Sequence, residues 1–187
     1  MSRDVSSTLW SRRAAVAGLL GLSGCGFRPL YGPITAPDGS EAGLEEELAA
    51  VRIGPLYDRT GQLLRRSLQR RMEESVPGTP ARYLLNVNVD LGAEILGYRQ
   101  DGTPTRIRFT LNGNWNLNTI AVPPRRVAAS GIPYRNIDSF NIPDLQFFSA
   151  DTSRDAALVR LMDDLSEEVA RQVAMALRRQ KEDRATG

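Results

Sequence analysis

The sequence predicts an α+β fold, a two-layer sandwich of order β-α-β-β-β-α in which two helices pack on one face of a mostly antiparallel sheet. Two segments, 83–91 and 106–118, alternate apolar and polar residues, which is typical of strands with one buried face. Two others, 58–75 and 152–180, repeat apolar residues every three or four positions, as amphipathic helices do. The chain has 187 residues, enough for one domain with a buried core.

The first two expected elements are a short strand at 49–53 and a helix at 58–75. Gly54-Pro55 ends the strand, because this pair marks turns and loops. Asp58 or Thr60 can cap the helix by accepting a hydrogen bond from a free backbone N–H. The apolar stripe that this helix should bury consists of Leu64, Leu68 and Met72.

The clearest strands are 83–91 and 106–118, and the turn signal Asp101-Gly102 lies between them. A further strand is expected at 126–140. Its alternation changes phase near Pro133, which has no backbone N–H to donate to a neighbouring strand. This last strand is therefore expected to be bulged or to lie at an edge of the sheet.

Asparagine is concentrated on the polar side of the two alternating strands. Because asparagine is a poor strand former, its abundance there suggests a role beyond solubility. Amides both donate and accept hydrogen bonds, so such a face could dock on a polar protein wall or bind sugars. The alternative is an ordinary solvated face. The residues are Asn86, Asn88, Asn112, Asn114, Asn116 and Asn118.

A long helix is expected to follow a loop at 143–152. Thr152–Asp155 resembles a capping box with aspartate in the glutamate position, and the helix should run to about Gln180. The single α+β domain is thus expected at 48–181, with 182–187 as a frayed tail. The apolar residues that should pack this helix on the sheet are Leu158, Leu161, Met162, Leu165, Val169, Val173, Ala176 and Leu177.

The N-terminal segment carries an export signal and a candidate lipidation site. Cys25, the only cysteine, follows the basic pair Arg12-Arg13 and an apolar run at 14–22. This order resembles the lipobox of bacterial lipoproteins, whose cysteine is acylated after removal of the signal peptide, here 1–24. The run is shorter than the roughly 20 residues that span a membrane, so 25–47 is predicted to be an acylated N-terminus and tether. The alternative is a buried free thiol.

Charge and composition narrow the possible functions. The 24 basic and 22 acidic residues become 21 of each after the cut, because Arg3, Arg12, Arg13 and Asp4 leave with the signal peptide. Residues 52–135 still carry a net charge of +7, which favours an anionic partner unless neighbouring faces neutralise it. The chain has no histidine, no Gly-rich phosphate loop and no paired-cysteine spacing. We therefore expect no enzyme, metal or cofactor, and no nucleic-acid partner.

Three segments resemble the LPS-assembly lipoprotein family, LptE, in its alphaproteobacterial form. The most distinctive is Cys25–Gly32, with the sequence CGFRPLYG, and the segments 59–65 and 98–102 match a helix start and a hairpin turn. The resemblance implies a lipid-anchored protein at the periplasmic face of the cell outer membrane. It would partner and plug the β-barrel translocon LptD and assist lipopolysaccharide assembly at the cell surface. Gly26, where inner-membrane lipoproteins typically have aspartate, agrees with that location.

The resemblance also implies which residues bind lipopolysaccharide. Basic residues near the hairpin turn and on the following strands have this role in the family, and by position these are Arg106 and Arg135, with Arg108 nearby. Arginine suits the phosphates of lipid A because its hydrogen bonds to them are charge-assisted. Two alternatives stay open: an outer-membrane adaptor or structural module that binds protein only, and a lipid-anchored periplasmic enzyme that uses carboxylates.

Overall fold

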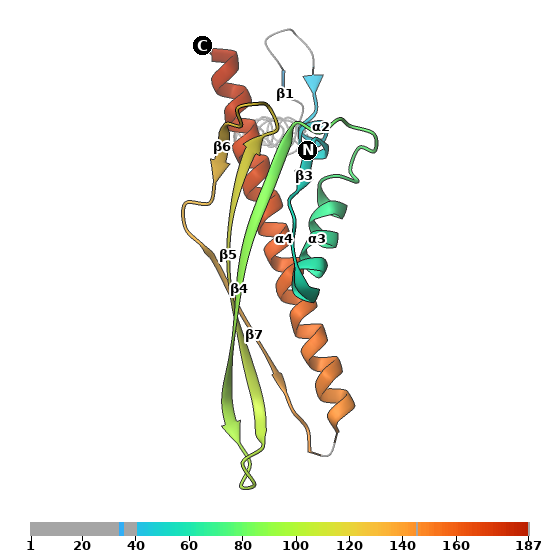
Figure 1. Ribbon diagram of the computed structural model, residues 1–187, viewed down its shortest axis with the longest axis vertical. Helices are drawn as coiled ribbons and strands as arrows, with labels where there is room; N and C mark the ends of the chain where they lie inside the picture. Colours follow the sequence, from blue (N-terminus) through green and yellow to red (C-terminus); the bar gives the residue numbers. More distant parts are fainter. Residues whose placement is uncertain (1–33, 36–40, 145, 187) are drawn as a thin grey trace, which may run out of the picture. The chain divides into compact units, whose positions relative to one another are not determined.

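The computed structural model describes residues 34–35, 41–144 and 146–186 (Figure 1). The expectations for the signal peptide, for Cys25 and for most of the tether lie outside these residues. In chain order the elements are β1 (Ile34–Thr35), β2 (Glu41–Ala42), α2 (Leu44–Ala49), β3 (Val51–Ile53), α3 (Asp58–Arg71), β4 (Tyr83–Tyr98), β5 (Pro104–Thr119), β6 (Arg126–Ala129), β7 (Tyr134–Asn141) and α4 (Phe147–Thr186).

The predicted fold class is confirmed: helices pack on a mixed, mostly antiparallel sheet. The main sheet has the order β3-β4-β5-β6, and β7 also pairs with β5. Only the β3–β4 pair among these is parallel. Figure 1 shows α3 and α4 on the same side of this sheet, so that among the described residues no helix covers its other face. The short strands β1 and β2 pair with each other and not with the main sheet.

The strand expected at 126–140 is two strands. β6 pairs with β5 at residues 116–118, and β7 pairs with β5 at residues 106–113, so both use the same edge of β5 in succession. The break falls between Ala129 and Tyr134 and contains Pro133, which cannot donate to a ladder. The phase change in the sequence therefore marks a real interruption, and both pieces lie at the sheet edge as predicted.

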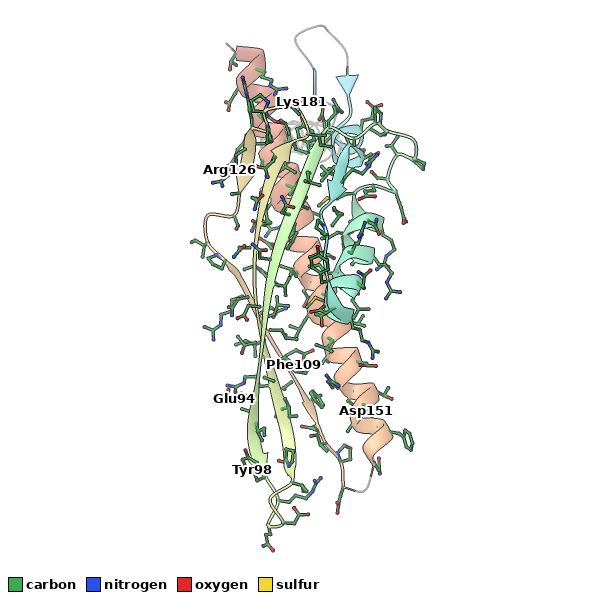
Figure 2. All side chains as sticks on the ribbon, in the orientation of Figure 1. Glu94, Tyr98, Phe109, Arg126, Asp151 and Lys181 are labelled. Atoms are coloured by element: carbon green, nitrogen blue, oxygen red, sulfur yellow. The ribbon has the colours of Figure 1, made fainter. Side chains whose placement is uncertain are left out.

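The odd-numbered residues of β4 and β5 face the helices, as their alternation predicts. In the helix-covered half of the hairpin these side chains are buried, and they pack against the apolar stripes of α3 and α4. Figure 2 shows Phe109 in this layer between the sheet and α4. The core residues from β4 and β5 are Tyr83, Leu85, Val87, Phe109, Leu111, Trp115 and Leu117.

Helix α3 begins where the sequence predicts and ends sooner. Asp58 has a φ of 65°, and its Oδ1 accepts a hydrogen bond from the backbone N–H of Gly61 at 2.7 Å. This is the side-chain capping expected of Asp58. The helix ends at Arg71 rather than near Ser75, although Met72 stays fully buried as the last member of the predicted stripe.

A buried polar cluster joins α3 to α4. The hydroxyls of Ser67 and Ser166 lie 2.8 Å apart, and Ser67 also donates to Asp163 at 2.6 Å. The Arg71 Nε donates to Ser166 Oγ at 3.0 Å. Because each buried hydroxyl has a partner, the cluster stabilises the helix pair without leaving an unpaired polar group.

Helix α4 begins earlier than its predicted capping box. The loop expected at 143–152 is already helical from Phe147, and Thr152 donates its hydroxyl to the Phe148 carbonyl within the helix instead of capping it. Residues 147–151 contain no glycine or proline, so nothing stops the helix from extending back towards Pro143. At its other end α4 continues to Thr186, beyond the expected end near Gln180.

The short helix α2 begins at Leu44, so the last residues of the segment predicted to be a tether are helical and packed on the domain. Its Glu47 is almost fully buried. The Glu47 Oε1 lies 3.1 Å from both Arg82 Nη1 and Lys181 Nζ, which brings the start of β4 and the end of α4 to the same carboxylate. Burial, followed by the charge of Glu47, raises the pKa of the Tyr83 hydroxyl beside it.

Candidate functional site

The helix-free face of the sheet carries a ladder of paired asparagines. In the β4–β5 register, Asn86 lies opposite Asn116 and Asn88 lies opposite Asn114. Asn86 Nδ2 donates to Asn116 Oδ1 at 3.3 Å, and Asn88 Nδ2 donates to Asn114 Oδ1 at 3.2 Å. Asn118 Nδ2 donates to the same Asn116 oxygen at 2.8 Å. The ladder fixes the amides in rows while leaving part of their hydrogen-bonding capacity for a partner.

The three arginines singled out in the sequence lie on this same face. Arg106 and Arg108 alternate along β5, and Arg135 of β7 lies opposite Asn112 of β5. Arg135 is therefore about 14 Å along the strand direction from Arg108, at 3.4 Å per residue. The structure brings the three residues onto one surface, continuous with the asparagine ladder, and their role in binding stays a prediction.

The arginines differ in how far they are already engaged. Arg106 donates from Nη2 and Nε to Ser139 Oγ at 2.7 and 3.2 Å. Arg108 pairs with Glu94, directly opposite it on β4, at 3.4 Å. Arg135 is exposed and makes no hydrogen bond or ion pair within residues 41–144 and 146–186. Arg106 and Arg135 are thus the guanidinium groups most available to an anion.

Acidic residues share this face and moderate its charge. Asp90 and Glu94 of β4 point to the same side as the arginines, because they occupy the same rows of the register as Asn112 and Arg108. Figure 2 shows Glu94 on the side of the hairpin away from α4. The face is therefore mixed rather than strongly basic, which suits contact with a polar surface as well as with phosphate groups.

A pocket of about 480 Å³ lies at the far end of the β4–β5 hairpin, on the helix side of the sheet. It is bounded by the hairpin end, by the connection from β7 to α4 and by the first turns of α4. Ile107 and Phe140 form its sheet wall, and Ala150 lies on its helix wall. A second pocket, of about 440 Å³, lies between β6 and the C-terminal half of α4 and includes Trp115 and Ala176.

The remaining sequence-based expectations concern Cys25, metal ligands and membrane-spanning helices. Cys25 lies outside the described residues. Among the residues that are described, no cluster of acidic, cysteine or histidine side chains could hold a metal ion. None of the described helices is both long enough and apolar enough to span a bilayer.

Sequence reasoning missed the pocket at the hairpin end and the buried ion pairs of Glu47. The alternation of β4 continues beyond Leu91 through Ala93 and Ile95, and this could have indicated a longer hairpin. The pocket itself depends on where α4 begins, and the capping box misplaced that point.

Comparison with known proteins gives a family and a fold. A family model described as "LptE: Lipopolysaccharide-assembly" matches residues 48–173. A lipoprotein from Caulobacter crescentus has a similar structure, with a TM-score of 0.58 and 20% identity over 74% of this chain and 97% of that one. Rare lipoprotein B from Shewanella oneidensis aligns with a TM-score of 0.46 and 11% identity, over 67% of this chain and 92% of that one. No curated protein sequence matches the chain.

Proposed function

This chain belongs to the LptE lipopolysaccharide-assembly family, and from that premise we propose that it is an outer-membrane lipoprotein that partners and plugs an LptD-like β-barrel. The family is one of non-enzymatic assembly proteins, so the function is one of binding. Acylation of Cys25 would anchor the protein to the periplasmic face of the membrane. There it would assist the assembly of lipopolysaccharide at the cell surface. We assign it to the alphaproteobacterial form of the family, from the resemblance of Cys25–Gly32.

The observation that carries this proposal is the helix-free face of the sheet. A lumen-facing barrel wall is polar, and a plug needs a broad surface that forms hydrogen bonds without burying unpaired charges. The asparagine ladder of Asn86, Asn88, Asn114 and Asn116 offers donors and acceptors over such a surface. The arginines beside it supply charge-assisted donors for the phosphates of lipopolysaccharide.

A second function is favoured by one specific contact. The ion pair between Arg108 and Glu94 means that the face is partly self-neutralised. A protein that only adapts one polar protein surface to another would have this mixed character, and it would need no lipid ligand. The second candidate is therefore an outer-membrane lipoprotein adaptor that binds protein only.

The first test is copurification. The acylated protein is extracted from outer membranes in mild detergent, isolated, and its partners are identified by mass spectrometry. A stoichiometric large β-barrel protein is the expected result. Recovery without any barrel protein would overturn the translocon role. Binding of purified lipopolysaccharide then separates the two candidates, since the protein-only adaptor predicts none.

A further inference from the structure

The pocket at the hairpin end has an apolar interior that the fold does not fill. Along the middle of α4 the space between this helix and strands β4 and β5 is filled by buried side chains, but at the hairpin end a cavity of about 480 Å³ remains. Phe140 is held against Phe109 with their ring centroids 5.4 Å apart, so the sheet wall is firm. A volume in this range is usual for a small-molecule site. The apolar lining residues are Pro104, Ile107, Phe140, Ile142, Pro143 and Ala150.

An exposed apolar track leads from the pocket across the hairpin. Ile95 lies opposite Ile107 and Tyr98 lies opposite Pro104 in the β4–β5 register, so both lie beside the pocket wall. Ile95 is 43% exposed and Tyr98 is 63% exposed. The outer edge of β4 beyond its pairing with β3 has no neighbour among the described strands. The track and the pocket therefore form one apolar surface that is open to a ligand.

Several polar groups around the pocket are already bonded to one another or to the backbone. Arg99 Nη2 donates to the Ile142 carbonyl at 2.6 Å, and the Ile142 N–H donates to the Thr105 carbonyl at 2.8 Å. Asp101 accepts hydrogen bonds from the N–H and the hydroxyl of Thr103. A peptide or a sugar entering here would lose its hydrogen bonds to water and gain few in return. An aliphatic chain has no polar groups to satisfy, and its burial is favourable.

We propose that this pocket holds one fatty-acyl chain of lipopolysaccharide, an inference that rests on the proposed function. The mouth of the pocket carries charges of both signs: Arg99 and Arg154 lie there with Asp101, Asp144 and Asp151. Arg99 is held near Asp144 at 3.9 Å, whereas Arg154 makes no hydrogen bond or ion pair within the described part of the chain. Arg154 is thus placed to meet a phosphate while the chain enters the pocket.

Matched ligands test the proposal with the full mature protein. Affinity is measured for intact lipopolysaccharide and for its fully deacylated derivative, which keeps the sugars and phosphates, in the same nonionic detergent. We expect the wild type to prefer the intact form at least tenfold. Ala150→Phe fills the pocket from α4 and should remove this preference without changing the affinity for the deacylated form. Ala176→Phe makes the same change in the other pocket, between β6 and α4, and should keep the preference.

A second measurement does not depend on a variant that folds. Lipopolysaccharide with a photoreactive group on an acyl chain should crosslink in the wild-type protein to residues 99–107 and 140–154. Crosslinks of the lipid confined to the asparagine face, or to the barrel protein and not to this chain, would overturn the proposal. Equal affinity for intact and deacylated forms would overturn it too, with the proposed function left standing. Failure of both forms to bind would count against lipopolysaccharide handling itself.

Discussion

Gly113 of β5 lies directly beneath Leu165 of α4, so close that a Cβ on Gly113 would be 2.7 Å from Leu165 Cδ1. Glycine normally weakens the interior of a strand because it has no side chain to pack. Because Gly113 has no side chain, α4 can approach the sheet closely, and the fully buried Leu165 fills the space above the strand. The position of α4 on β5 is therefore set by the smallest residue of the strand.

The first prediction concerns this contact. Gly113→Ala should destabilise the protein by about 1–3 kcal/mol, because overpacking against Leu165 outweighs the better strand propensity of alanine. Denaturant unfolding measures the change. The double variant Gly113→Ala/Leu165→Ala should lose less stability than the sum of the two single changes, since the new methyl group then occupies vacated space. Additive losses would show that the clash is relieved elsewhere.

The second prediction concerns Glu47. Glu47→Gln should lower the free energy of unfolding by about 1–3 kcal/mol, because it leaves Arg82 and Lys181 without the carboxylate that both approach. Glu45→Gln, at an exposed position of the same helix, is the matched control and should have little effect. Thermal or denaturant unfolding compares the two. Equal effects of the two substitutions would show that the ion pairs of Glu47 stabilise the fold no more than an exposed glutamate does.

The third prediction is a pH dependence. Burial and the neighbouring Glu47 raise the pKa of Tyr83 above its ordinary value, so the folded state keeps this proton longer than the unfolded state does. The resulting stability is present in full below the unfolded-state pKa of about 10 and is lost as pH rises through the folded pKa. Tyr83→Phe should therefore flatten the alkaline limb of stability against pH. Tyr98→Phe, at an exposed site, should leave the limb unchanged.

The fourth prediction concerns the arginines of the helix-free face. Arg106→Glu/Arg108→Glu should weaken lipopolysaccharide binding at least tenfold, because hydrogen bonds to charged groups contribute about 1.5–3 kcal/mol each. Arg65→Glu/Arg66→Glu makes the same charge change on α3 and should retain binding. Circular dichroism verifies the fold of both variants. Unchanged affinity in the first variant would remove these residues from the binding site.

The fifth prediction uses the partner of Arg108. Glu94→Gln releases Arg108 from its ion pair at 3.4 Å and removes a negative charge from the same face. Affinity for lipopolysaccharide should rise several-fold, with a steeper dependence on salt, if Arg108 contacts phosphate. The protein-only adaptor predicts no response to this substitution, so titration at two salt concentrations separates the two functions.

The helix-free face could be predicted from the sequence because it depends on local rules. Alternation over 83–91 and 106–118 fixes which residues share a face, and the register of β4 and β5 has Arg106 and Arg108 on the same face as the asparagines. The face on which Arg135 lies depends on how β7 pairs with β5, and the change of alternation near Pro133 prevents this pairing from being read from the sequence. The start of α4 could not be predicted from its capping box. Thr152 matches the first position of such a box, but the residues before it can also form a helix, and the structure extends α4 back through them.

The pocket and the Glu47 contacts could not be predicted for a different reason. Both depend on segments far apart in the chain: Glu47 meets Lys181, and Ile107 faces Ala150 across the pocket. No local pattern fixes such distances. The pocket depends on the register of the hairpin together with the point at which α4 begins, and the Glu47 contacts depend on how α2 packs against the end of α4.

The pairing of Glu47 with Lys181 also has a consequence for the order of folding. Helix α2, which carries Glu47, precedes every strand of the main sheet, whereas Lys181 lies in α4, which follows them all. During synthesis the ion pair therefore cannot form until nearly all of α4 has been made. The β4–β5 hairpin can pair before that, so the docking of α2 on the end of α4 completes a domain whose sheet is already formed.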